Sequence, residues 1–85
     1  MAYSIQFTPA ARRQFSRLDS SVQQRIGAAI DGLAANPRPP GAKRLKGSEN
    51  LWRIRIGDYR VIYQIHDREI VVVIVTIGHR SDVYR

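Results

Sequence analysis

The stretch LWRIRIGDYRVIYQI, residues 51–65, decides the fold. Apolar and polar side chains alternate on both sides of Gly57 and Asp58, and a period of two is typical of half-buried strands. A two-residue connection that begins with glycine suits a type II′ or type I′ turn. The stretch therefore predicts a β-hairpin that turns at residues 57–58.

Pairing across this turn determines which side chains share a face of the hairpin. Arg55 pairs with Arg60, and directly paired residues lie on the same face. One face then consists of core residues: Trp52, Ile54, Ile56, Tyr59, Val61, Tyr63 and Ile65. The other face carries Arg53, Arg55 and Arg60. Like charges at opposed positions cost about 0.2–1 kcal/mol per pair, so a bound anion explains this cluster better than stability does.

A short strand and a helix are predicted at the N-terminus. Residues 3–7 alternate in polarity, with Tyr, Ile and Phe on one side. Thr8 is a favourable N-cap, and Pro9 fits the first helical position. Apolar residues then follow at helical spacing: Ala11, Phe15 and Leu18.

A second helix follows almost directly. Ser20 and Gln23 match a capping box, and Asn36-Pro37 ends the helix. Its apolar positions repeat along one face: Val22, Ile26, Ala29, Ile30 and Leu33. Because few residues separate the two helices, they should form an antiparallel helical hairpin that covers the core face of the sheet.

The rest of the chain supplies a basic loop and a final strand. Residues 37–50 are rich in proline and glycine and predict a connecting loop. Residues 70–77 are apolar on both faces, which is typical of an interior strand. The predicted fold class is α+β in the order β-α-α-β-β-β, with an N-terminal strand and a helical hairpin packed on a small twisted antiparallel sheet. Residues 1–85 should form one domain.

The register of the final strand determines what lies beside the arginines. With a two-residue turn at Asp67-Arg68, Val75 lies opposite Arg60 on the preceding, antiparallel strand. The chain end then emerges near the first turn, where Arg80 and Tyr84 can fold over the rim of the arginine face. A shift of one residue would move every side chain to the opposite face.

Charge favours a polyanionic partner. The 85 residues include 14 Lys and Arg against 7 Asp and Glu, which gives a net charge of +7. Residues 37–63 alone contribute 7 − 2 = +5, so the excess is local.

Other classes of function are disfavoured by composition. Cysteine is absent, and the two histidines and seven acids lack ligand-like spacing, so we expect no thiolate nucleophile, no cofactor and no structural metal. The longest apolar run is residues 70–77, against roughly 20 residues for a membrane span. The N-terminus lacks the apolar core of a signal peptide, so a cytoplasmic protein is expected.

An arginine face of this kind suits phosphoryl transfer to a neighbouring ribose hydroxyl. The reaction needs cations around the pentacoordinate phosphate, a base for the 2′-hydroxyl and an acid for the leaving 5′-oxygen. Arginine grips phosphate with its planar fork, but it stays protonated and is a poor base. The base must therefore be His79, a group of the RNA or a group of a larger assembly.

Three segments resemble the RelE family of bacterial toxin–antitoxin ribonucleases, within the broader RelE/ParE superfamily. They are LWRIRIGDYRVIYQI at residues 51–65, IGHRSDVYR at residues 77–85 and, more weakly, KRLKG at residues 43–47. The resemblance implies cleavage of messenger RNA in the A site of the 30S ribosomal subunit, leaving a 2′,3′-cyclic phosphate and a 5′-hydroxyl. It also implies neutralisation by a cognate acidic, RelB-like antitoxin, with operator DNA reached only through the antitoxin complex.

The resemblance also implies roles for individual residues. The implied catalytic residues are Arg55, Arg60, Arg80 and Tyr84, with His79 as an acid–base candidate. The implied RNA-binding residues are Lys43, Arg44, Lys46 and Arg53. Arg53 and Arg55 fall where well-known members have lysines, and this difference at position 55 leaves the identity of the general base open.

Two other functions remain open at this point. A ParE-like protein would keep the fold but inhibit DNA gyrase without catalysis. A plain nucleic-acid-binding module would show steeply salt-dependent binding and no toxicity.

Overall fold

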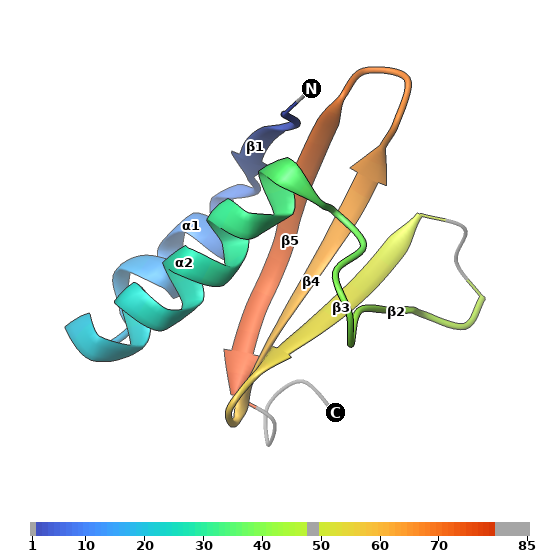
Figure 1. Cartoon of the computed structure of the whole chain (residues 1–85). Coiled ribbons are helices and arrows are strands. Elements are labelled where there is room, and N and C mark those ends of the chain that lie inside the picture. Colours follow the sequence, from blue (N-terminus) through green and yellow to red (C-terminus); the bar gives the residue numbers. More distant parts are fainter. Residues whose placement is uncertain (1, 48–49, 80–85) are drawn as a thin grey trace.

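The computed structural model describes residues 2–47 and 50–79, and over these residues it contains two helices and five strands (Figure 1). In chain order these are β1 (Ser4–Phe7), α1 (Pro9–Ser16), α2 (Ser20–Ala35), β2 (Lys43–Arg44), β3 (Leu51–Ile56), β4 (Tyr59–His66) and β5 (Val71–His79). None of the helices in this part of the chain is both long and apolar enough to cross a membrane.

The strands form one sheet in the order β1-β5-β4-β3-β2. β2, β3, β4 and β5 pair with their neighbours in antiparallel fashion, whereas β1 pairs with β5 in parallel. The predicted α+β class and element order are confirmed, but the sheet is mixed rather than purely antiparallel. Because β1 occupies the outer edge of β5, β5 is the interior strand that its two apolar faces predict.

The β3–β4 hairpin has the predicted register. Ile56 pairs with Tyr59, Arg55 with Arg60, and Trp52 with Tyr63. Gly57 has a φ of 59°. The next turn residue, Asp58, does not have a positive φ, since Ile70 is the one non-glycine residue with positive φ among those described. Positive φ at the first turn position alone is the pattern of a type II′ turn, which glycine adopts without strain.

The predicted register between β4 and β5 is wrong. His66 pairs with Val71, so the connection has four residues rather than two, and a bulge lies between Ile62 and Tyr63. Together these features move the pairing by three residues, and Arg60 lies opposite Gly78 instead of Val75. Because three is an odd number, side chains near the end of β5 lie on the opposite face from the one predicted.

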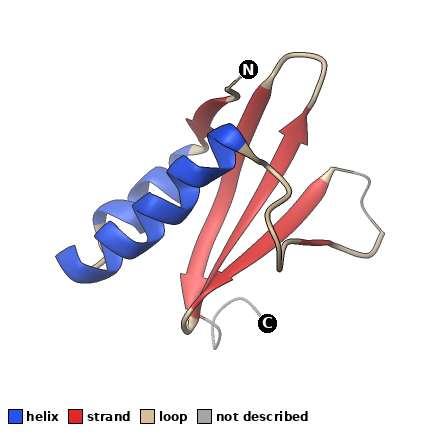
Figure 2. Ribbon diagram, in the orientation of Figure 1, coloured by secondary structure: helices blue, strands red, loops and turns tan. Residues whose placement is uncertain are grey.

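The core lies between the helical hairpin and one face of the sheet (Figure 2). Its buried residues are Ala11, Ile26, Ile30, Leu33, Ile54, Val61, Tyr63, Ile65, Val72, Ile74 and Ile77. The predicted core face of the hairpin is confirmed, since its remaining members pack against this cluster: Trp52, Ile56 and Tyr59.

One of the two predicted helix caps forms. The Thr8 hydroxyl accepts a hydrogen bond from the Ala11 amide at 3.1 Å and caps α1. The predicted capping box of α2 is wrong, because the N-cap is Asp19 and makes no side-chain cap bond. Gln23 instead donates from Nε2 to the Phe15 carbonyl at 2.8 Å, which ties α2 to the end of α1.

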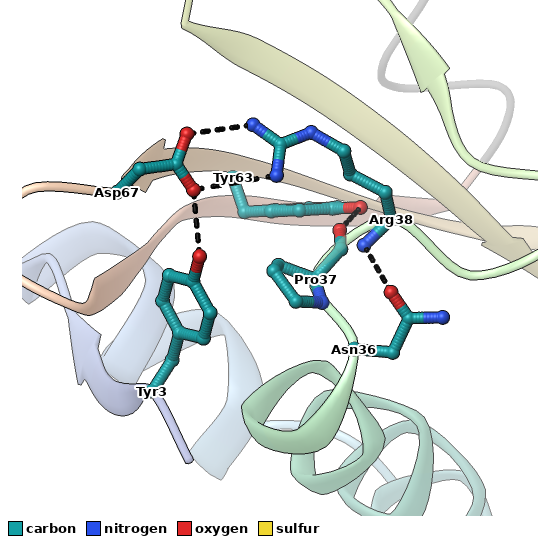
Figure 3. Close-up of polar contacts among 6 residues, drawn as sticks. All are labelled: Tyr3, Asn36, Pro37, Arg38, Tyr63 and Asp67. Carbon is teal, nitrogen blue, oxygen red and sulfur yellow. Dashed lines mark hydrogen bonds and ion pairs between the residues drawn. The ribbon is translucent and has the colours of Figure 1, made fainter. Parts of the chain in front are cut away.

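Polar contacts fasten the segment after α2 to the sheet (Figure 3). The buried Tyr63 hydroxyl donates to the Pro37 carbonyl at 2.8 Å. Arg38 pairs with Asp67 at 2.9 Å, and the Tyr3 hydroxyl donates to the same carboxylate at 2.6 Å. The hydrogen bond from Arg38 and, to a smaller extent, the one from Tyr3 hold the pKa of Asp67 below its usual range.

Tyr63→Phe should destabilise the protein by about 1–2 kcal/mol, because the buried Pro37 carbonyl would lose its donor. Burial raises the pKa of Tyr63 from 10.0 to about 12. The folded protein thus holds the phenol proton more tightly than the unfolded chain does, and this stabilisation is complete below pH 10 and lost as the pH rises toward 12. Urea denaturation between pH 10 and pH 12 should show that the free energy of unfolding falls less steeply with pH in Tyr63→Phe than in the unaltered protein. The half-buried Tyr59→Phe is the control, and equal behaviour of the two variants would contradict the assignment.

Candidate functional site

Three arginines lie on the face of the sheet that the helices do not cover; we call Arg53, Arg55 and Arg60 the arginine face. Arg55 and Arg60 are directly paired, and Arg53 is two residues along the same strand, so the strand alternation aims all three the same way. Figure 2 shows both helices on the other side of the sheet. The predicted gathering of the three arginines is confirmed.

A fourth cation joins the arginine face from a segment that was predicted to be a loop. Lys43 in β2 pairs directly with Arg53 and therefore lies on the same face. Its neighbour Arg44 pairs with Trp52 and lies on the opposite face. Lys46 is exposed after β2 has ended. Of Lys43, Arg44 and Lys46, the pairing brings only Lys43 to the arginine face.

The arginines influence one another electrostatically. Arg60 is half-buried, and loss of solvation lowers its pKa from the ordinary arginine value. The positive charges of Arg55 and then Arg53 lower this pKa further. Arginine nevertheless stays protonated at neutral pH. Positive charges that lie close together repel one another, and a bound anion would relieve this repulsion. The planar guanidinium group of arginine matches the oxygen geometry of phosphate.

A small notch lies at the end of the hairpin, beside the arginine face. Its volume is about 80 Å³, and it is lined by Arg55, Gly57, Asp58, Tyr59 and Arg60. The notch has room for a group of phosphate size, and two of the residues that line it are arginines. Sequence reasoning treated Asp58 only as a turn residue and Tyr59 mainly as a core residue, and nothing in their spacing indicates a shared notch.

His79 is not brought to the arginine face. It pairs with Tyr59, and the two rings meet edge to face with centroids 5.3 Å apart. Tyr59 belongs to the core face, so His79 lies on the opposite side of the sheet from Arg60. Gly78 takes the place beside Arg60. Arg80 and Tyr84, the other predicted members of the site, lie outside the described residues.

The described ranges, 2–47 and 50–79, contain no group of three His, Asp or Glu side chains that could hold a metal ion. The charged side chains of the arginine face can neutralise negative charge and form bidentate hydrogen bonds to an anion. These features define a class, a small α+β protein with a cluster of cations on the open face of its sheet.

Comparison with known proteins identifies the family. A family model described as "ParE toxin of type II toxin-antitoxin system, parDE" matches residues 5–84. The mRNA interferase toxin RelE of Escherichia coli K12 is 30% identical over 88 residues, covering 99% of this chain and 92% of that protein. Toxin RelG of Mycobacterium tuberculosis is 31% identical over 86 residues, covering 100% and 99%.

Solved structures agree with this result. The isolated RelE toxin of Escherichia coli superposes with a TM-score of 0.83 at 28% identity, covering 98% of this chain and 92% of that one. The archaeal RelE–RelB complex from Pyrococcus horikoshii matches with a TM-score of 0.84 at 26% identity, covering 96% and 99%. The chain belongs to the ParE toxin family of type II toxin–antitoxin systems, and within it the chain is a RelE-like toxin.

Arg53→Gln should leave the stability unchanged or raise it by up to about 1 kcal/mol at low ionic strength, because Arg53 is opposed by Lys43. The gain should shrink in high salt, which screens the repulsion. Thermal denaturation at two salt concentrations measures this, with Arg12→Gln on the exposed side of α1 as the control. Destabilisation by Arg53→Gln at both concentrations would mean that Arg53 has a structural role.

Proposed function

We propose that this chain is a ribosome-dependent endoribonuclease that cleaves messenger RNA in the A site and thereby inhibits translation. The observation that carries the proposal is the phase of the β3–β4 hairpin, which aims Arg53, Arg55 and Arg60 at one exposed surface. Relatives named mRNA interferase support an RNA substrate over other polyanions.

In the proposed reaction, the ribose 2′-oxygen attacks the adjacent phosphorus while the bond from phosphorus to the 5′-oxygen breaks. The products are a 2′,3′-cyclic phosphate and a 5′-hydroxyl. The nucleophile belongs to the RNA, so the reaction requires no metal and no protein nucleophile. What the protein supplies is positive charge around the dianionic transition state, and such preorganised charge is a large catalytic term.

The geometry divides the work among the basic residues. Arg55 and Arg60 line the notch and contact the scissile phosphate in this proposal. Lys43 and Arg53 lie next to them on the same face and hold the neighbouring backbone, with the exposed Lys46 further out. Arg44 lies on the opposite face, and its position does not support the RNA contact that the resemblance implies. Arg80 and Tyr84 keep the roles that the resemblance implies, as transition-state arginine and substrate-contacting tyrosine.

Two protons must move in this reaction, one from the 2′-hydroxyl and one to the 5′-oxygen. The packing of His79 against Tyr59, on the face opposite Arg60, argues against His79 as the proton acceptor. A group of the RNA or of the ribosome accounts better for this step. Dependence on the ribosome follows naturally if the ribosome supplies a group that the arginine face lacks.

The proposed regulator is a cognate, acidic, RelB-like antitoxin, through which alone the toxin contacts operator DNA. Solved relatives include the RelBE toxin–antitoxin complex of Escherichia coli, at 25% identity with a TM-score of 0.82. A net charge of +7 invites a partner of opposite sign. A partly disordered segment that folds as a helix on the toxin would cover basic surface.

Arg60→Gln should abolish or strongly reduce messenger RNA cleavage without unfolding the protein, because it removes a charge from the notch but keeps most of the side chain. Sequencing of RNA ends after brief induction measures cleavage, and growth arrest should be relieved in parallel. Arg12→Gln is the matched control and should cleave as the unaltered chain does. Intact messenger RNA with accumulating DNA breaks would instead indicate a gyrase inhibitor.

Raising the salt concentration should slow association of the antitoxin more than it speeds dissociation, since complementary charge acts mainly on the encounter rate. Stopped-flow association at several ionic strengths tests this expectation. An association rate that does not change with salt would contradict electrostatic steering.

A further inference from the structure

The α2 helix contributes a cation to the tip of the β3–β4 hairpin. Arg25 is an exposed residue in the second turn of α2, on the helix side of the sheet. Its guanidinium nevertheless reaches the hairpin turn: a Cβ placed on Gly57 would lie 2.6 Å from the Arg25 Nη2 atom. That distance is shorter than any ordinary contact, so the guanidinium packs on the bare Cα of Gly57.

The backbone conformation of Gly57 is what requires glycine at this position. Its φ of 59° belongs to the left-handed region that side chains avoid. The absence of a side chain also leaves the space that the Arg25 guanidinium occupies. The contact with Arg25 is long-range, and no pattern in the sequence near residue 57 reveals it.

Arg25 reaches the hairpin turn from the helix side of the sheet, whereas the arginine face lies on the other side. Gly57 also lines the notch whose other walls include Arg55 and Arg60. Three arginines from three elements, α2, β3 and β4, thus lie around a single two-residue turn. Within the described residues, Arg25 makes no hydrogen bond or ion pair with a protein acceptor. Arg25 is exposed, and its N–H donors are available to a ligand.

We propose that Arg25 binds a backbone phosphate of the RNA adjacent to the scissile phosphate, so that the RNA leaves the arginine face around the hairpin tip. The proposal rests on the proposed ribonuclease function and adds a second phosphate subsite to it. Cations on the two sides of one turn match a ligand with repeated negative charges, which a single-stranded RNA backbone provides. A single small anion would engage only one side of the turn.

The alternative for Arg25 is a purely structural contact that supports the turn. Arg25→Gln keeps the length and polarity of the side chain and removes its charge, whereas Arg25→Lys keeps the charge and removes the planar fork. A structural role predicts a loss of thermal stability in Arg25→Gln. A phosphate-binding role predicts unchanged stability and a change in RNA affinity that depends on the number of phosphates in the ligand.

The test compares two RNA ligands that lack the attacking 2′-hydroxyl at the cleavage position: a dinucleoside monophosphate, with one phosphate, and a longer single strand. Arg25→Gln should bind the first as the unaltered protein does and bind the second about three- to tenfold more weakly. The slope of log affinity against log salt for the longer strand should fall by about 0.7, the value for one phosphate contact of a single strand. Arg25→Lys should restore the slope.

Each other outcome would overturn the proposal. Equal weakening for both ligands would mean that Arg25 acts on the scissile phosphate or through the turn, and no weakening for either would mean that it does not touch RNA. Normal RNA binding with weakened antitoxin binding would assign Arg25 to the protein partner.

Arg60→Gln separates this proposal from the proposed function: it should weaken binding of both ligands, and if it weakens neither, the ribonuclease site itself is wrong. The exposed Arg17, the C-cap of α1, supplies the matched charge control, Arg17→Gln.

Discussion

The pairing phase of β3 against β4, set by the two-residue turn at Gly57 and Asp58, is the constraint on which the rest of the structure depends. Side chains alternate along a strand, so a shift of one residue would exchange the apolar and basic faces of the whole hairpin. In the observed phase, Ile54 and Val61 enter the core while Arg55 and Arg60 lie together on the opposite face. Burial of the apolar face therefore holds the arginines together against their mutual repulsion.

This arrangement links stability to function. The helical hairpin contributes Ile26, Ile30 and Leu33 to the same core that Val61 and Tyr63 join from the sheet. Because the helices cover only one face of the sheet, the other face stays available for a ligand. The backbone of the paired strands fixes the Cα position of each arginine. The strand positions of the charged groups are thus set before an anion binds, as the proposed electrostatic catalysis of phosphoryl transfer requires.

Local signals in the sequence were sufficient where one short feature determines the geometry. The Gly57-Asp58 turn has two residues, so the β3–β4 register follows by counting, and Thr8 before Pro9 places the start of α1. The register of β5 could not be obtained in this way. Asp67-Arg68 resembles a two-residue turn, but the chain turns over four residues with Ile70 in the left-handed region.

The remaining differences come from contacts between segments that are distant in sequence. The bulge between Ile62 and Tyr63 inserts one extra residue in β5. This shift places His79 on the same face as Tyr59 and Gly78 opposite Arg60. Gln23 bonds to the end of α1 rather than completing a capping box. Lys43 joins the arginine face through a two-residue strand in a segment rich in proline and glycine. These outcomes depend on tertiary packing, which local propensity does not encode.

The central claim is that Arg53, Arg55 and Arg60 act together on one RNA phosphate backbone. The most direct measurement is an NMR titration that follows the arginine Nε–H resonances while a short RNA without the attacking 2′-hydroxyl is added. The account predicts that the resonances of these three arginines shift together, with one apparent affinity that falls as salt increases, while those of Arg12 and Arg13 on α1 stay in place. Shifts centred on α1, or an arginine face whose resonances do not respond to RNA, would contradict it.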